Sequence, residues 1–294
     1  MAAFPFGQDI VATHDMLVEG VHFTPGCPPS DLAWKLVAVN LSDLAAMAAR
    51  PVGLLTGVGF SPACDADWRR DFVAGLDRVL AEYGCPLWGG DTVAAPHGII
   101  LSATAIGQVA PGGAIARSTA HDGDDLWVSG TIGDSGLGLK VALGETGYPP
   151  AAAKALLARY RRPLPRLALG RALAGVASAM MDVSDGLAID AGRLAAASGL
   201  HAELVLDQVP LSAAARLVAP DALLAHVTAG DDYELLFAAP PSAAGAVMAA
   251  ATANGTPVTS VGRLVRGAGA LSLWQAGKAV PLPQRLGHLH THQR

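Results

Sequence analysis

The sequence is poor in charge, in aromatic side chains and in cysteine. Of its 294 residues, 15% are charged, 5% are aromatic and about half (51%) are apolar. This balance is typical of a compact globular protein and excludes a disordered chain. The three cysteines, Cys27, Cys64 and Cys85, are an odd number without paired spacing. We therefore expect reduced structural thiols rather than a zinc site or a disulfide framework.

Targeting and membrane signals are also missing. The first residues are neither basic nor apolar enough for a signal peptide, and no run of eighteen apolar residues is free of Gly or Pro. The formal net charge of −5 offers no broad cationic face for nucleic acid or anionic lipid. We expect a cytoplasmic protein that binds neither nucleic acid nor membrane.

The common nucleotide and hydrolase motifs are absent as well. The sequence contains no G-x-x-x-x-G-K-[ST] loop, G-x-G-x-x-G fingerprint, G-x-S-x-G elbow or H-E-x-x-H pair. A bound nucleotide would have to be held through aspartates and metal ions.

What the sequence does contain is a series of short motifs built around aspartate. They are D-M-L-V-E-G-V-H-F from Asp15, N-L-S-D from Asn40, G-G-D-T from Gly89, M-D-V-S-D-G from Met181 and G-D-D-Y-E-L-L-F from Gly230. At ~6 Å and an effective dielectric of ~20, each like-charged pair costs roughly 3 kcal/mol. If these motifs converge, cations must hold them together, and hard cations held by carboxylates usually also hold phosphates. The pattern predicts a magnesium-dependent site for a nucleoside triphosphate.

Each motif also has a plainer interpretation. Asp182 and Asp185 lie between an apolar strand and a helix, where the turn completed by Ser184 and Gly186 offers free N–H groups to a phosphate. Ser184 or Asp185 could equally be a simple helix cap. The same ambiguity holds for Ser42 with Asp43 and for Gly133-Asp134-Ser135.

Three further features remain open from the residues alone. The double glycine before Asp91 permits either close approach of a ligand or a plain tight turn. His22 lies among apolar residues, a setting more typical of a structural histidine. The arginines between Arg159 and Arg166 suit either phosphate binding or a surface helix end.

The order of apolar segments predicts an α+β protein with two domains. We expect strands over residues 11–18, 53–60, 99–109, 126–129, 180–183, 202–206, 233–238 and 258–265, and helices over 31–49, 66–83, 151–160 and 187–198, with another helix ending near 143. A turn and a polar run rich in Gly and Asp follow residue 110, which places the domain boundary between residues 1–117 and 118–294.

Taken together and in this order, the motifs resemble those of the thiamine-monophosphate kinases, a family in the aminoimidazole-ribonucleotide-synthetase-like superfamily. The resemblance runs from about Val11 to Val265, and it includes Arg117 before Ser118, G-D-S-G-L-G-L from Gly133 and Y-R-R-P-x-P-R from Tyr160. Any single motif is weak evidence for the family, but the whole set in this order is highly specific.

The resemblance implies a two-domain fold in which the N-terminal domain binds ATP and pairs with its copy in a homodimer. It implies transfer of the ATP γ-phosphoryl group to thiamine monophosphate, with several Mg²⁺ ions. It assigns catalytic roles to Asp43, Asp182 and Asp185. By the same matching, the metal ligands are Thr13, Asp15, Asp43, Asp91, Asp182 and Asp185, the ATP contacts are Gly90, Asp91, Arg117 and Ser184, and the substrate contacts are His22 and Asp231.

The chemistry suits such residues. A phosphomonoester has a second pKa near 6, so at neutral pH the acceptor is already largely a dianion and needs no general base. What it needs is relief from repulsion by the triphosphate, which magnesium ions supply.

The chain departs from the family pattern at several positions. The family has a Gly-Asp-Asp-Ala motif with a metal ligand upstream of the position of Asp15, and we do not equate Asp9 with that ligand. We expect that the chain lacks this N-terminal strand and loop and turns over slowly. Asp231 stands where the family usually has Glu, His14 replaces a hydroxyl residue, and His288 aligns loosely with an aromatic residue. The alternatives are another ATP-dependent enzyme of the superfamily with a different acceptor, or a nucleotide-binding paralogue with little turnover.

Overall fold

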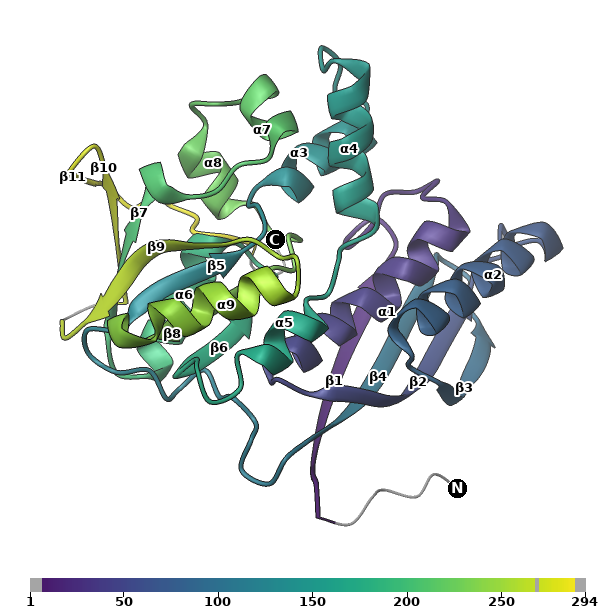
Figure 1. The fold of residues 1–294 in the computed structure, drawn as a ribbon. Coiled ribbons are helices and arrows are strands. Elements are labelled where there is room, and N and C mark those ends of the chain that lie inside the picture. Colours follow the sequence, from purple (N-terminus) through teal and green to yellow (C-terminus); the bar gives the residue numbers. More distant parts are fainter. Residues whose placement is uncertain (1–6, 268–269, 289–294) are drawn as a thin grey trace.

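The first part of the chain forms a four-stranded sheet with two helices on one face (Figure 1). The computed structural model describes residues 7–267 and 270–288. The sheet has the order β1-β4-β2-β3, in which β2 and β3 are parallel and the other pairs are antiparallel. The elements are β1 (Asp9–Val18), α1 (Pro29–Ala46), β2 (Arg50–Phe60), α2 (Ala66–Tyr83), β3 (Leu87–Ala94) and β4 (Ile100–Val109).

Helix α2 has clear start and stop signals. The side chain of Asp65 accepts a hydrogen bond from the backbone N–H of Trp68 at 2.8 Å, which is an N-cap. Gly84 ends the helix with a φ of +59°, a conformation that favours glycine. Between these ends, Phe72, Leu76 and Val79 are buried against the first part of the core.

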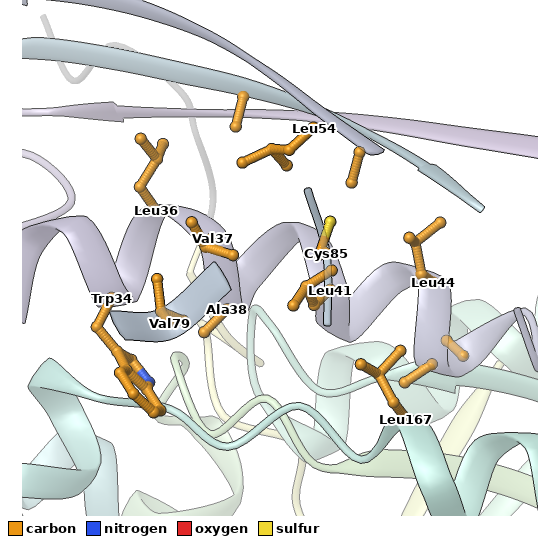
Figure 2. Close-up of a cluster of buried hydrophobic side chains, with 14 of the residues drawn as sticks. Trp34, Leu36, Val37, Ala38, Leu41, Leu44, Leu54, Val79, Cys85 and Leu167 are labelled. Carbon is orange, nitrogen blue, oxygen red and sulfur yellow. The ribbon is translucent and has the colours of Figure 1, made fainter. Parts of the chain in front are cut away.

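Helix α1 is buried on nearly every side because it lies between the two sheets of the molecule. It packs on β1 and β4 of the first sheet and on α5, β6 and β8 of the second part. Figure 2 shows Leu36 and Leu44 on the side of Leu54 in β2, whereas Trp34 points away from the sheet. The indole N–H of Trp34 donates to the carbonyl of Pro163 at 2.9 Å. The helix thus joins both parts of the chain.

The second part contains a seven-stranded sheet of order β11-β10-β7-β9-β5-β8-β6. Helices α3 and α4 form a pair at one end of this sheet, beside α7 (Figure 1). The elements are β5 (Asp125–Ser129), α3 (Asp134–Ala142), α4 (Pro150–Arg161), α5 (Leu167–Ala172), β6 (Ala179–Asp182), α6 (Leu187–Ala197), β7 (His201–Val205), α7 (Ala213–Val218), α8 (Leu223–Thr228), β8 (Leu235–Ala239), α9 (Ala244–Ala253), β9 (Val258–Val265), β10 (Leu271–Gln275) and β11 (Lys278–Val280), with short 3₁₀ turns η1 (Leu206–Gln208) and η2 (Pro241–Ala243).

The largest hydrophobic cluster crosses from the first part to the second. It joins α1 and α2 to Trp127 of β5, Leu167 of α5 and Phe237 of β8. A second cluster fills the space between the seven-stranded sheet and α6. The boundary at residue 117 falls between β4 and β5 and stays a prediction.

Most predicted elements are confirmed, and the differences have physical causes. The helix predicted over 31–49 ends at Ala46, since Ala48 takes a left-handed φ of +59°. The tight-turn alternative for Gly89-Gly90 is wrong because both glycines lie within strand β3. A Cβ at Gly90 would come within 2.4 Å of the Thr56 carbonyl oxygen, so this glycine permits close packing on β2. None of the helices in residues 7–267 and 270–288 is long and apolar enough to cross a membrane.

Candidate active site

Five predicted aspartates line one cavity of about 730 Å³ between the two parts of the chain. Asp15 lies on β1, Asp43 in the last turn of α1 and Asp182 at the end of β6, while Asp185 and Asp231 lie in the loops that precede α6 and β8. Because α1 packs on both β1 and β6, it brings carboxylates from both sheets together.

Two hydroxyl groups donate hydrogen bonds to these carboxylates and fix their orientation. Ser42 donates a hydrogen bond to Asp182 Oδ2 at 2.6 Å, and Thr13 donates to Asp43 Oδ2. Ser42 is buried, as is most of Asp182. Since Ser42 and Asp43 are neighbours in α1, one helix turn orients two of the acidic groups.

The carboxylates are close enough to perturb one another. Burial raises the pKa of Asp15 to about 6, with further contributions from the charge of Asp43 and a hydrogen bond to it. Burial also raises the pKa of Asp43, although Thr13 and Arg117 oppose the shift. The pKa of Asp182 is raised well above its usual range by burial and then by the charge of Asp43. Without a cation, burial and mutual repulsion therefore favour the protonated form of these carboxyl groups.

The donor set suits a hard divalent cation, which prefers carboxylate and hydroxyl oxygens. Within the described ranges, however, no three His, Cys, Asp or Glu side chains are arranged as a ready-made metal site. The fit therefore rests on the chemistry and the mutual repulsion of Asp15, Asp43 and Asp182.

The loop before α6 differs from both sequence interpretations. The backbone N–H groups of Ser184, Asp185 and Gly186 donate to Asp190 Oδ2 at 3.1, 3.0 and 3.2 Å. The prediction that they are free for a phosphate is therefore wrong. The helix-cap alternative is also wrong, because Gly186 is the N-cap residue and no side chain caps the helix there.

Arg193 connects this loop to its acceptor. Its Nη1 donates to Asp190 Oδ1 at 2.8 Å and also pairs with Asp185. Burial raises the pKa of Asp190 to about 6, which its hydrogen bonds partly oppose. The arrangement holds Ser184 and Asp185 at the cavity wall, where both side chains belong to the lining.

The predicted substrate contacts also lie at the cavity. The ring Nδ1 of His22 accepts a hydrogen bond from the backbone N–H of Val18 at 3.0 Å. In the neutral ring this assigns the proton to Nε2, which makes that nitrogen a donor. His14 and His288 line the same cavity, and the backbone N–H of His288 donates to the carbonyl of Asp185 at 2.9 Å.

Three predicted ATP contacts lie outside this cavity, and their roles stay predictions. Gly90 and Asp91 are exposed on β3, an edge strand that β2 and β4 separate from β1. Arg117 is exposed in the segment between β4 and β5, and its charge lowers the pKa of Asp43.

The arginines from the last turn of α4 to the start of α5 bind acidic side chains of the protein itself. Arg159 and Arg166 form ion pairs with the fully buried Glu234 at 2.7 and 2.6 Å. Arg161 and Arg162 pair with Asp31 of α1. Arg159 does lie in the last turn of α4, as the helix-end interpretation predicted, but its side chain and that of Arg166 are mostly buried. Phosphate binding by these arginines stays a prediction.

Several cavity residues were not identified from the sequence. Lys140 of α3 is one of them. Ser135, which the sequence left open between a helix cap and a site, also lines the cavity, and its buried hydroxyl has no hydrogen-bond partner among the described residues. Asp190 and Lys35 do not line the cavity, but they form hydrogen bonds with the lining residues Asp185 and Asp231. The only sequence signal for Asp190 was its place one turn into the helix after Gly186.

Comparison with models of protein families shows the class of protein to which the two parts of the chain belong. Residues 1–109 match the model of the N-terminal domain of AIR synthase related proteins, and residues 121–272 match the model of the C-terminal domain. This agrees with the division of the chain into a four-stranded and a seven-stranded sheet.

The relatives define the family. A thiamine-monophosphate kinase of Caulobacter vibrioides is 41% identical over 290 residues, which cover 97% of this chain and 81% of that protein. The crystal structure of thiamine-monophosphate kinase from Stenotrophomonas maltophilia K279a is 38% identical, with a TM-score of 0.85 over 94% of this chain and 87% of that one. AaThiL complexed with AMPPCP and TMP is 29% identical, with a TM-score of 0.84 over 98% and 89%. The chain belongs to the thiamine-monophosphate kinase family.

Proposed function

We propose that this chain transfers the γ-phosphoryl group of ATP to thiamine monophosphate, in line and with magnesium, to give thiamine diphosphate. The observation that carries the proposal is the convergence of Asp15, Asp43, Asp182 and Asp185 on one cavity in a member of this family. The complex of AaThiL with AMPPCP and TMP supports the choice of both substrates.

The residues around the cavity have two roles in this proposal, metal binding and the orientation of the metal ligands. Asp43, Asp182 and Asp185, with Asp15 and Thr13, would hold Mg²⁺, which when bound would neutralise the facing phosphates. We assign Asp91, which lies outside this cavity on β3, to metal binding as well. Thr13 and Ser42 fix the directions of the Asp43 and Asp182 carboxylates. No side chain has to remove a proton, since the acceptor phosphate is largely a dianion near neutral pH.

Substrate contacts follow from the remaining polar groups. We assign His22 and Asp231 to thiamine monophosphate, and Gly90, Asp91, Arg117 and Ser184 to ATP. The Nε2–H of a neutral His22 can donate to an acceptor oxygen of the substrate. His288, which aligns loosely with an aromatic residue of the family, also lines the cavity.

We also propose that the chain divides into two domains at residue 117 and that it is cytoplasmic. We further propose that it forms a homodimer through the first sheet. Ile10 and Met16 of β1 and Ile100 of β4 are large apolar side chains that are exposed on the first sheet. They lie on the face opposite the helices, where Ala12 faces Ile106 across β1 and β4. A second copy covering this face would bury them, and would lie next to the cavity residues His14 and Met16.

Product formation tests the proposal. The purified chain is incubated with Mg²⁺, ATP and thiamine monophosphate, and thiamine diphosphate is followed by chromatography. We expect thiamine diphosphate and ADP in equal amounts, and none when EDTA replaces the metal. Release of ADP or phosphate only with another acceptor, or nucleotide binding without product, would contradict the proposal.

Sedimentation equilibrium tests the dimer separately. Ile106→Lys should shift the mass from two chains to one, because it places a charge in the middle of the covered face. Val73→Lys, on the exposed side of α2, is the matched control and should stay dimeric. A wild-type chain that sediments as a monomer would remove the dimer but not the kinase activity.

A further inference from the structure

Lys35 is a buried cation directly beneath the cavity. It lies in α1 with a side chain only 1% exposed, and it does not belong to the cavity lining. A buried ammonium group is costly unless it is paired. Its Nζ donates to Asp231 Oδ2 at 2.9 Å and to the carbonyl of His22 at 3.2 Å, and it lies 4.0 Å from the centre of the Tyr160 ring. Lys35 therefore contacts both residues that we assign to the acceptor substrate.

The partner carboxylate is held in an uncommon backbone conformation. Asp231 has a φ of +70° and Tyr233 a φ of +51°, both in the left-handed region. The backbone N–H groups of these two residues donate to the carbonyls of Ser184 and Val183, each at 2.8 Å. Such a conformation persists only where its surroundings fix it, and it often marks a functional site.

One oxygen of this carboxylate keeps acceptor capacity. Lys35 occupies Oδ2, while Oδ1 is 3.4 Å from the Tyr233 hydroxyl, a long hydrogen bond. A carboxylate oxygen accepts two hydrogen bonds. The side chain is 32% exposed and lines the cavity, so Oδ1 can accept a donor from a bound molecule.

We propose that Lys35 is a positioning residue that aims Asp231 Oδ1 at the amino group on the pyrimidine ring of thiamine monophosphate. The inference rests on the proposed function. Apart from its phosphate, this substrate has one N–H donor, the exocyclic amino group, and one fixed positive charge, on the thiazolium ring. An anionic acceptor suits the amino group, and the buried ammonium disfavours placing the thiazolium ring at the same spot. The pair thus selects both the substrate and its orientation.

Oxythiamine monophosphate is the probe, because a carbonyl group replaces the amino group. The wild-type chain should prefer thiamine monophosphate by about 10- to 100-fold in kcat/KM, the usual effect of a hydrogen bond to a charged group. Lys35→Met, of similar volume, should raise the KM for thiamine monophosphate at least about tenfold and bring the preference close to one. The KM for ATP should not change.

Two further variants complete the experiment. Asp231→Asn should abolish or invert the preference, because an amide N–H can donate to the carbonyl of the probe. Lys154→Met, on the exposed surface of α4, is the matched control and should behave as wild type.

Retention of the wild-type preference in Lys35→Met would overturn the inference, as would an equal rise of both KM values. If Lys35→Met does not fold, Asp231→Asn decides, since its carboxylate is partly exposed, and an unchanged preference there overturns the inference too. Failure of the wild-type chain to form thiamine diphosphate would instead remove the proposed function itself.

Discussion

At the scale of single residues, the site consists of carboxylates whose folded positions favour the protonated form. Asp15, Asp43 and Asp182 all have raised pKa values, because burial and one another's charges disfavour ionisation. Their geometry is kept by Thr13 and Ser42 rather than by basic partners. Such an arrangement costs stability at neutral pH, which indicates a functional rather than a structural role.

We expect Asp43→Asn and Asp182→Asn to lose activity without losing stability. Each removes a negative charge from the cation-binding group and should lower kcat at least about 100-fold, as removal of a main electrostatic stabiliser does. Without magnesium, each should melt no lower than wild type, because a repulsive charge has gone. Kinetics and thermal melts check this, with the exposed Asp221→Asn as control. Full activity in either variant would show that its assigned metal role is wrong.

Glu234 provides a residue-scale prediction about stability. Arg159 and Arg166 both pair with this fully buried carboxylate, and Ser129 donates to it at 2.6 Å. These partners lower the pKa of Glu234 against the effect of burial. Breaking a buried pair leaves uncompensated charge, so Glu234→Gln should cost about 3–5 kcal/mol in the free energy of unfolding.

The matched control for this prediction is Glu203→Gln. Glu203 pairs with Arg263 at 2.8 Å at the surface, where solvent screens such a pair and its contribution to stability is small. Urea unfolding of both variants gives the comparison. Equal costs would contradict the assignment of Glu234 as the central anion of a buried ion cluster.

The residues of the site could be predicted only in part. Asp15, Asp43, Asp182, Asp185 and Asp231 were identified from ordered motifs and do line one cavity. Lys35 was missed because its partner, Asp231, is distant in the sequence. Asp190 was missed because the sequence does not show that its carboxylate accepts hydrogen bonds from the backbone N–H groups of the loop before it. Spacing alone cannot show that a turn's N–H groups are already satisfied.

At the scale of elements, α1 decides how the site is assembled. It packs on the first sheet with one side and on α5, β6 and β8 with the other. Its last turn carries Ser42 and Asp43 into the cavity, while Lys35 lies two turns earlier. The packing of this helix therefore sets the distance between carboxylates from the two sheets.

Gly170 tests this packing. It lies in α5, where an added Cβ would come within 2.1 Å of the carbonyl oxygen of Ala45 in α1. Gly170→Ala should therefore destabilise the protein by about 1–3 kcal/mol through overpacking. Gly245→Ala in α9 is the control: no atom lies within 4 Å of its added Cβ.

In the control, alanine improves helix propensity and should stabilise by up to about 1 kcal/mol. Opposite signs in the free energies of unfolding are the expected result. Stabilisation by both substitutions would mean that α1 and α5 do not approach as closely as described.

Periodicity predicted some elements well and missed others. Helix α2 and strand β9 have the expected bounds, because their apolar spacing and flanking glycines agree. Strand β3 was missed since glycine and aspartate are disfavoured in strands. Helix α9 is nearly uniform in apolar character, so its sequence contains no amphipathic period to detect.

At the scale of the whole molecule, the cavity exists because two sheets from different parts of the chain meet across α1. The acidic groups come from both parts, so neither part alone contains the site. The shared hydrophobic cluster fixes the two parts relative to each other. Magnesium binding, if it neutralises these groups, must therefore be linked to the stability of the whole chain.

This linkage has a definite sign with pH. The folded-state pKa of Asp15 is raised from 3.8 to about 6, and those of Asp43 and Asp182 are raised as well. The stability that comes from their protonation is complete at about pH 4 and is lost as the pH rises through and above about 6. Without a cation, the melting temperature should fall over this range.

The most direct test of the central claim is the melting temperature at about pH 8, with magnesium and with EDTA, for the wild-type chain and for Asp43→Asn. If divalent ions bind the acidic cavity, magnesium will raise the wild-type value by several degrees at about pH 8, far less at about pH 5, and little in the variant. An equal rise in both proteins, or no rise in the wild type, would contradict the account.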